Sequence, residues 1–282
     1  DGSPVEGDPI YGGLAGLVKT AALEWKHVLC RALDMPHDAG LCREQAQAAV
    51  SLMMTQGAVE MGLNQETCNI PELEPQQVSS RMPRLSKADV VVITGGAKGV
   101  TSVCALELAK AFSPTIVLIG RSPEPGPEPE WLATLSDPSD IKKELLSREF
   151  TGKKVTPAIL EQRFRALMSN REITQSLSQI KAAGANVRYV QADIRDQAQI
   201  DGVFNRIREE FENITAVIHG AGVLQDKLIV EKTPEQYTTV FDTKVKGLNA
   251  LIHATRSDSL KYFILFSSVA ARTGNMGQAD YA

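Results

Sequence analysis

The sequence predicts an α/β fold built around a parallel β-sheet. Of its 282 residues, 43% are hydrophobic, which is enough to bury a sizeable core. From residue 90 onward, short apolar runs alternate with helical segments, and such alternation is typical of right-handed βαβ crossovers. A glycine-rich turn directly follows the first of these runs. Together these observations favour a doubly wound, Rossmann-like sheet, preceded by part of a smaller α/β unit.

Charge and composition argue against several classes of protein. The chain has 30 basic and 34 acidic side chains, so its formal net charge is −4, and we expect no general binding to nucleic acid or to anionic membranes. No apolar run approaches the ~18 residues of a membrane span, and residues 1–13 lack the pattern of a secretory leader. The four cysteines and four histidines show no metal-ligand spacing. We therefore expect a cytoplasmic protein without a metal.

Residues 1–85 are interpreted as one unit that ends in a linker. Apolar side chains at helical spacing predict helices over 13–26 and 41–56, and the apolar run 28–35 predicts a strand between them. The stretch 69–89 contains three prolines and little periodicity, as linkers do.

Five apolar runs after the linker predict the strands of the main sheet. They are residues 90–94, 115–120, 187–192, 215–220 and 261–266. The first, VVVIT, is a continuous β-branched run, as expected of a strand that is buried on both faces. Helices are expected through Leu106 and Ala109, across 200–211, where the apolar spacing is strongly amphipathic, and over 234–256.

Residues 123–182 separate the second and third predicted strands by far more than one crossover helix needs. The segment begins with a proline-rich loop and continues with charged helical stretches around 138–149 and 157–183. We interpret it as a helical insertion that packs outside the sheet as a structural embellishment.

The turn TGGAKGVT, residues 94–101, joins the first of these strands to a helix. Glycines there permit positive φ angles and a close approach of the backbone to a ligand, and the helix N-terminus attracts a pyrophosphate. The alternative is a plain tight turn. We expect this turn to bind a dinucleotide through the following residues: Thr94, Gly95, Gly96, Lys98, Gly99 and Val100.

The end of the second strand indicates which dinucleotide binds. Arg121 and Ser122 stand at this position. In dinucleotide-binding sheets, an acidic residue here would hold the free 2′-hydroxyl of the adenosine ribose, whereas an arginine accommodates a 2′-phosphate. With Lys98 adding positive charge, the sequence favours NADPH over NADH, although a solvated surface arginine is the alternative for Arg121.

The third and fourth strands also end in candidate cofactor residues. Asp193, followed by Ile194, could accept a hydrogen bond from the adenine amino group, or Asp193 could cap a helix. The segment 220–222, Gly220, Ala221 and Gly222, is small enough to let a ribose approach the backbone. His219 before it is interpreted as a packed turn histidine and not as a catalyst.

The last predicted strand ends at a serine pair, and Tyr281 follows Ser268 by 13 residues. Reduction of a carbonyl needs an acid for the developing alkoxide, and a phenol serves near neutral pH only if a cation lowers its pKa. Lys244 on the preceding helix can be that cation and can bind the nicotinamide ribose, while the Ser268 hydroxyl can orient the carbonyl oxygen. Ser267 and Lys246 are the rival positions, and a buried core tyrosine is the alternative for Tyr281.

Together these motifs resemble the short-chain dehydrogenase/reductase superfamily, and most of all the ketoreductase domain of polyketide and polyunsaturated fatty acid synthases. The resemblance spans nearly the whole chain except 121–182, and four segments carry it: GLAGLVKTAALEW (13–25), HGAGVLQDKL (219–228), FDTKVKGLNALIHAT (241–255) and FSSVAARTGNMGQADYA (266–282). Lys244 fits the synthase version, which has lysine on the helix and asparagine four residues after the tyrosine. Ordinary members of the superfamily exchange these two residues.

The resemblance implies the domain organisation and the activity. Residues 1–85 would be the C-terminal part of a non-catalytic structural subdomain plus linker, and 86–282 an NADPH-binding catalytic subdomain that stops after its tyrosine. Such a domain reduces a β-ketoacyl thioester on an acyl carrier protein to the β-hydroxyacyl thioester, beside other synthase domains in the same polypeptide. Tyr281 would give the proton, Ser268 would position the carbonyl and Lys244 would tune Tyr281. The alternatives are a discrete dehydrogenase for a free alcohol or ketone, and an inactive scaffold domain.

The sequence departs from the family pattern in the glycine turn and near the tyrosine. Thr101 replaces the usual third glycine, which puts the fine geometry of cofactor binding in question. The motif associated with D-configured alcohols reads LQD at 224–226, keeping its second aspartate, and no tryptophan precedes Tyr281 in its loop. Met276 and Asp280 replace the proline and asparagine that accompany this type. We expect the D-alcohol.

Overall fold

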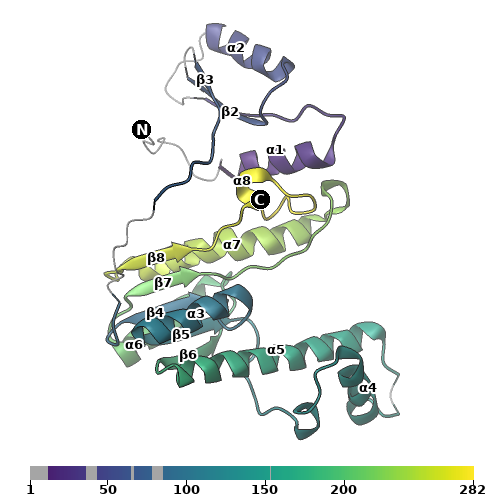
Figure 1. The fold of residues 1–282 in the computed structure, drawn as a ribbon, viewed down its shortest axis with the longest axis vertical. Helices are drawn as coiled ribbons and strands as arrows, with labels where there is room; N and C mark the ends of the chain where they lie inside the picture. The colour runs from purple at the N-terminus through teal and green to yellow at the C-terminus, as the bar shows by residue number, and fades with distance from the viewer. Residues whose placement is uncertain (1–11, 36–42, 65–66, 78–84, 153) are drawn as a thin grey trace. The chain divides into compact units, whose positions relative to one another are not determined.

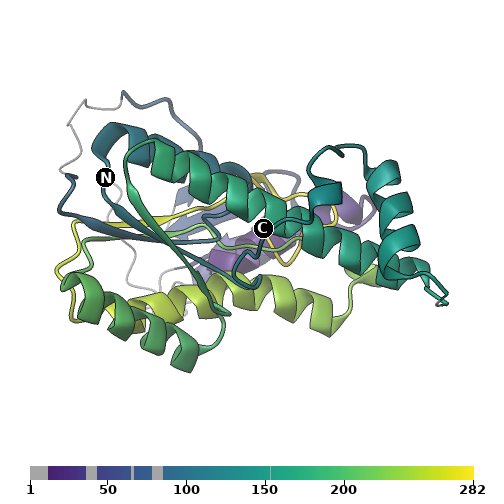
Figure 2. The same cartoon turned by 90° about the horizontal axis from the view of Figure 1, so that it is seen from below.

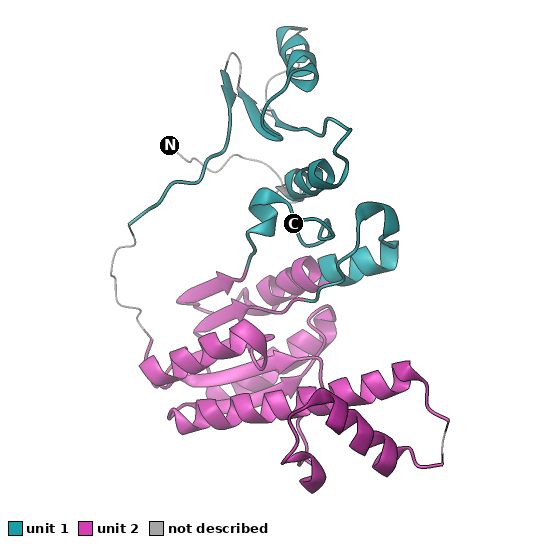
Figure 3. Cartoon of the chain, turned by 45° about the vertical axis from the view of Figure 1, so that its right-hand side comes forward, with its two compact units in different colours: residues 1–82, 223–242, 267–282 teal, residues 83–222, 243–266 magenta. Residues whose placement is uncertain are grey.

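The computed structural model describes residues 12–35, 43–64, 67–77, 85–152 and 154–282 (Figure 1). The chain divides into two compact units (Figure 3). Unit 1 comprises residues 1–82, 223–242 and 267–282, and unit 2 comprises residues 83–222 and 243–266. The sequence predicts one boundary near residue 85, whereas the structure groups two later segments, including the one that carries Tyr281, with the N-terminal residues.

Unit 2 contains a five-stranded parallel sheet of order β6-β5-β4-β7-β8. The strands are β4 (Val90–Thr94), β5 (Thr115–Gly120), β6 (Asn186–Gln191), β7 (Ala216–His219) and β8 (Tyr262–Leu265). Each strand lies within one residue of its predicted bounds. The chain runs outward from β4 on one side and returns to its other side at β7, which confirms the doubly wound sheet. The switch point is therefore the carboxyl edge between β4 and β7, where ligands of such sheets bind.

Helices cover both faces of this sheet (Figure 2). They are α3 (Gly99–Phe112) and α5 (Pro157–Ala182) on one face, and α6 (Gln197–Phe211) and α7 (Pro234–Thr255) on the other. Because side chains alternate along a strand, Val91 and Ile93 of β4 pack with α3 and α5, whereas Val90 and Val92 pack with α6 and α7. The fully buried Phe204 anchors α6 in this second core.

The long segment between β5 and β6 contains a 3₁₀ turn, η2 (Glu130–Leu132), then α4 (Pro138–Glu149) and α5. A small core of Leu132, Ile141, Leu145 and Leu167 holds these elements together. The interpretation that the whole insertion packs outside the sheet is wrong for the second part of α5, because Ile173 and Ile180 are fully buried in the sheet core. With 26 residues, α5 is long enough to serve both as crossover helix and as part of the insertion.

Unit 1 begins with a small α/β region. It contains α1 (Gly12–Glu24), β1 (Ala32–Asp34), α2 (Arg43–Met54), β2 (Glu60–Asn64) and β3 (Thr67–Asn69). β1 pairs with β2 in parallel, and β2 pairs with β3 in antiparallel fashion. Both predicted helices are present, although 41–42 lie outside the described residues. The strand predicted over 28–35 is reduced to its last part. β2 and β3 were not predicted because β2 has only two alternating apolar residues, Met61 and Leu63, and β3 is only three residues long.

The other segments of unit 1 contain a 3₁₀ turn, η3 (Ile229–Glu231), the first residues of α7, and the short helix α8 (Ala270–Thr273). α8 packs against α1. Among all the described helices, none has the length and apolar character that crossing a bilayer requires.

Candidate nucleotide-binding and catalytic site

The glycine turn between β4 and α3 has the backbone that its sequence predicts. Gly95 and Gly99 adopt φ angles of +69° and +55°, which favour glycine. A Cβ atom on Gly95 would lie 2.8 Å from the Cα of Ala221, so the turn passes very close to the end of β7. Gly96 serves packing, because a Cβ there would lie 2.7 Å from side-chain atoms of the core. The side chain of Lys98, at the N-cap of α3, makes no capping hydrogen bond.

Thr101, the departure from the third glycine, is buried against the end of β7. A Cβ on Gly220 would lie 2.5 Å from the Thr101 Cγ2, so the threonine occupies the space that Gly220 leaves. Thr101 thus fills a packing position beside the end of β7, and Gly95 and Gly99 keep the positive φ angles expected of the turn. Val100, by contrast, is largely exposed on the first turn of α3.

A buried chain of hydrogen bonds connects the ends of β4 and β7 to α7. The His219 Nε2 lies 3.1 Å from the carbonyl oxygen of Lys244, and its Nδ1 lies 2.8 Å from the Thr94 Oγ1. The Thr94 Oγ1 in turn accepts from the Ala221 N–H at 3.2 Å. Burial lowers the pKa of His219 to about 4, so the ring is neutral at physiological pH. This confirms the interpretation of His219 as a packed histidine, and it adds a function: His219 holds the backbone of Lys244.

Lys244 points its ammonium group at the carboxyl end of β8. Its Nζ donates to the carbonyl oxygen of Phe266 at 3.0 Å, and burial lowers its pKa. Gly247, one turn further along α7, allows a close contact, because a Cβ there would lie 2.9 Å from the Ile194 Cγ1. Ile194 is accordingly a buried core residue, and only its backbone remains a candidate for cofactor contact.

The end of β5 is held in place by side chains of β6. The Tyr189 hydroxyl donates to the carbonyl oxygen of Ser122 at 2.8 Å, and the Gln191 amide donates to that of Arg121 at 3.2 Å. The Lys98 Nζ donates to the Ser122 Oγ at 3.2 Å. Burial lowers the pKa of Lys98, with the charge of Arg121 acting in the same direction. The structure therefore places Lys98 in contact with Ser122 and within electrostatic reach of Arg121, the two cations that the sequence assigns to a 2′-phosphate.

Asp193 follows β6 as predicted, but its carboxylate already has a partner. It forms a salt bridge with the Arg195 guanidinium at 2.7 Å and accepts from the Arg195 backbone N–H at 3.0 Å. This hydrogen bonding holds its pKa below the usual range. The helix cap is Asp196, which accepts from the Gln199 N–H, so Asp193 does not cap α6.

Ser268 and Tyr281 belong to unit 1. The Ser268 Oγ accepts from the Ala270 N–H at 3.1 Å, which leaves the hydroxyl hydrogen available for donation. Tyr281 is half-buried, and its backbone N–H bonds to the Gln278 carbonyl oxygen at 3.0 Å. Because Lys244 belongs to unit 2, the convergence of the three side chains stays a prediction.

Sequence reasoning missed the residues that hold the catalytic loop, defined here as residues 275–282. The Glu24 carboxylate accepts from the backbone N–H groups of Gly277 (2.8 Å) and Ile229 (2.7 Å). Lys232 and Asp280 form a salt bridge of 2.7 Å in which the two side chains are only 4% and 2% exposed. A single charged residue in a sequence is most often solvated, so no pattern indicated Glu24 or Lys232, and Asp280 was noted only as a departure from the family pattern.

A family model described as the KR domain matches residues 89–282. The chain belongs to the KR domain family. Over 96% of its length, this KR domain is 33% identical to a polyunsaturated fatty acid synthase subunit from Thraustochytrium sp. and 27% identical to the polyketide synthase PksN of Bacillus subtilis. It covers 10% and 4% of these relatives, and thus corresponds to a small part of each.

Solved structures show the same architecture. The KR domain aligns over 97% of its length with a ketoreductase domain from the bacillaene assembly line, at a TM-score of 0.71 and 25% identity. It aligns over its whole length with an A-type ketoreductase from a modular polyketide synthase, at a TM-score of 0.73 and 20% identity, which shows the fold alone. The chain spans 54% and 50% of these two structures.

Proposed function

We propose that this KR domain reduces a β-ketoacyl thioester, carried on an acyl carrier protein, to the β-hydroxyacyl thioester with NADPH. The observation that carries the proposal is the cluster at the carboxyl edge of the sheet, where a glycine turn of positive φ lies beside Lys98, Arg121 and Ser122. Two cations and a hydroxyl at this position fit a 2′-phosphate. Family membership supports ketoreduction within a multidomain synthase.

Different residues at this edge of the sheet bind different parts of the cofactor. The backbone of Gly95, Gly96 and Val100 approaches the pyrophosphate, and the Gly99 N–H, which donates to the Glu172 carboxylate at 3.0 Å, joins them once that carboxylate is displaced. The Thr94 hydroxyl holds the end of β7 through the Ala221 N–H. Lys98, Arg121 and Ser122 hold the 2′-phosphate. Asp193 and the backbone of Ile194 border the adenine, and the segment 220–222 leaves room for the nicotinamide ribose. When bound, NADPH supplies the hydride that reduces the carbonyl carbon.

Tyr281 donates the proton that the developing alkoxide takes up, and the Ser268 hydroxyl orients the carbonyl oxygen by a hydrogen bond. The Ser268 Oγ accepts from the Ala270 N–H, so its own hydrogen can be donated to the carbonyl oxygen of the substrate. Lys244 stabilises the negative charge that Tyr281 carries after it has given up its proton, and it binds the nicotinamide ribose. Asp226 of the LQD motif accepts from the Gln278 amide at 3.1 Å, which couples the segment expected to set the D-alcohol to the catalytic loop.

The test is NADPH oxidation by the full-length synthase polypeptide with a β-ketoacyl thioester surrogate, and it includes the chirality of the product. Tyr281→Phe should reduce turnover by at least ~100-fold, because it removes the proton donor, and should leave the dissociation constant for NADPH unchanged. Turnover that survives in Tyr281→Phe would contradict the assigned role. An inactive scaffold would not bind the cofactor, so a wild-type polypeptide that shows no NADPH binding in a fluorescence titration would favour that alternative.

The partners follow from the same proposal. The acyl carrier protein presents the substrate, and the other synthase domains share the polypeptide, as the small share of each relative that this chain covers supports. A discrete dehydrogenase would instead act on a free alcohol or ketone. A surrogate on a carrier protein that reacts no faster than a free ketone would favour that alternative.

A further inference from the structure

Helix α5 presents one polar face to the glycine turn. Three of its side chains, at positions 169, 172 and 176, follow the spacing that places residues on one side of a helix. Each contacts a different residue of the turn: Ser176 Oγ donates to Ala97 O (2.9 Å), Glu172 Oε1 accepts from Gly99 N (3.0 Å), and Ser169 Oγ accepts from Lys98 Nζ. The insertion therefore forms part of the nucleotide site.

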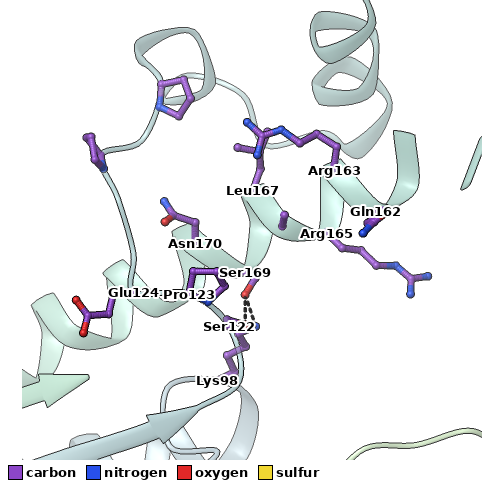
Figure 4. A pocket seen from close by; sticks show the side chains of 13 residues that line it. Lys98, Ser122, Pro123, Glu124, Gln162, Arg163, Arg165, Leu167, Ser169 and Asn170 are labelled. Carbon is purple, nitrogen blue, oxygen red and sulfur yellow. Dashed lines mark hydrogen bonds between the residues drawn. The ribbon is translucent and has the colours of Figure 1, made fainter. Parts of the chain in front are cut away.

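Lys98, Ser122 and Ser169 form a cluster with an excess of hydrogen-bond donors (Figure 4). Lys98 donates to both hydroxyl oxygens, and the two oxygens lie 2.9 Å apart. An ammonium and two hydroxyls carry roughly five donor hydrogens, of which three are used within the cluster. The remaining two have no acceptor inside it. An oxyanion is the ligand that such a set complements.

Hydrogen bonds and a salt bridge hold the segments that carry the cluster together. Asn170 and Gly126 exchange two hydrogen bonds, of 2.8 and 3.0 Å, and the Arg171 guanidinium forms a bidentate pair with Glu128 at 2.7 and 3.0 Å. These contacts fasten the loop after Ser122 to α5, directly beside Ser169. The cluster lines a cavity of about 570 Å³, which leaves ample room for a phosphate group (Figure 4).

We propose that Ser169 determines cofactor specificity by joining Lys98 and Ser122 in binding the 2′-phosphate of NADPH. This inference rests on the proposed use of NADPH, and it gives the insertion a function beyond structural support. Glu172 contacts the turn one helical turn away and partly balances the charge of Lys98. Ser169 thus adds a third segment, α5, to the two that carry Lys98 and the pair Arg121 and Ser122.

The experiment compares Ser169→Ala with the wild-type full-length polypeptide by fluorescence titration. Dissociation constants are measured for NADPH, NADH, adenosine 2′,5′-bisphosphate and adenosine 5′-monophosphate. Ser169→Ala should bind NADPH and the bisphosphate roughly ten-fold more weakly, because one hydrogen bond to a charged group is lost, and should bind the other two ligands unchanged.

The matched control is Ser178→Ala, an exposed serine on the opposite side of α5, which should leave all four constants unchanged. Ser169→Thr keeps a hydroxyl and should retain most of the affinity.

The outcomes separate this inference from the proposed function. An equal loss of NADPH and NADH binding in Ser169→Ala, or no loss for either, would overturn the inference while leaving NADPH-dependent reduction intact. A wild-type protein that binds the bisphosphate in a Ser169-dependent way but does not reduce the thioester would support the inference and overturn the proposed function.

Discussion

His219 fixes the backbone of Lys244 through its own protonation state. The carbonyl oxygen of Lys244 can only accept, so the Nε2 of His219 carries the hydrogen, and the Thr94 hydroxyl donates to Nδ1. In this arrangement the neutral ring satisfies both partners. Burial, which lowers the pKa to about 4, keeps the ring in this form.

The free energy of unfolding should therefore depend on pH through His219. The unfolded chain protonates this histidine near pH 6.5, whereas the folded chain keeps it neutral until pH falls to about 4. The unfolded state binds more protons between these values, so stability should fall by up to about 3 kcal/mol as pH is lowered from 6.5 to 4. Urea unfolding across this range measures the slope, which His219→Gln should reduce and His253→Gln, at an exposed histidine, should keep. The same slope in His219→Gln would contradict the assignment.

Helix α1 acts as a support for the catalytic loop within unit 1. Lys19 donates to the carbonyl oxygens of Ala271 and Arg272 at 3.3 and 2.9 Å, where a cation complements the end of α8. Glu24, one and a half turns later, holds the loop itself through the Gly277 N–H. Two charged side chains of α1 thus contact the segment that leads to Tyr281 and hold it within unit 1.

Glu24→Gln should reduce kcat roughly ten-fold, because a loosened loop displaces Tyr281 from its substrate. The dissociation constant for NADPH should stay unchanged, since the nucleotide residues lie in unit 2. Stopped-flow turnover and fluorescence titration measure the two quantities. Glu72→Gln removes an exposed carboxylate from the linker and should change neither. A weakened NADPH affinity with normal kcat would show that Glu24 does not act through the loop.

The salt bridge between Lys232 and Asp280 also holds the catalytic loop. Both side chains are almost fully buried, and the Lys232 Nζ also donates to the Gln225 carbonyl oxygen at 2.8 Å. Lys232→Met should lower the free energy of unfolding by about 3–5 kcal/mol, because it leaves the Asp280 carboxylate buried without its cation. The double variant Lys232→Met/Asp280→Leu should recover much of this loss, and Lys110→Met, in an exposed pair with Glu107, should cost about 0.5 kcal/mol or less in urea unfolding. A single variant as stable as the wild type would refute the structural importance of the pair.

The sheet could be predicted from the sequence much better than its surroundings. Its central strands β4, β5 and β7 are apolar runs such as VVVIT, because they are buried on both faces, and this pattern is visible locally. β2 has no such run, since its sequence EMGLN includes a glycine and two polar residues. In the site, Lys98, Arg121 and Ser122 were identified because each stands next to a strand end. Ser169, Glu24 and Lys232 were not, because their contacts join segments that are far apart in the chain and leave no local pattern.

At the scale of the whole molecule, the candidate machinery is divided between two discontinuous units. The glycine turn, the cluster of Lys98, Ser122 and Ser169, and Lys244 lie in unit 2. Ser268, Tyr281 and the residues that hold the catalytic loop lie in unit 1. The chain passes between the units several times, so each of them is assembled from separated segments. Cofactor binding and proton donation should therefore respond to different sets of substitutions.

Double variants test this division. Glu24 holds the catalytic loop and Ser169 belongs to the cluster with Lys98 and Ser122, and the two share no hydrogen-bond partner. Their effects on kcat/KM for NADPH, converted to free energies, should add within about 0.5 kcal/mol. Glu24 and Lys232, by contrast, hold the same two segments, 225–229 and 277–280, so Glu24→Gln and Lys232→Met should show a coupling of about 0.5–3 kcal/mol. Strong coupling in the first pair together with additivity in the second would contradict the division, because it would mean that the phosphate cluster and the catalytic loop respond as one element.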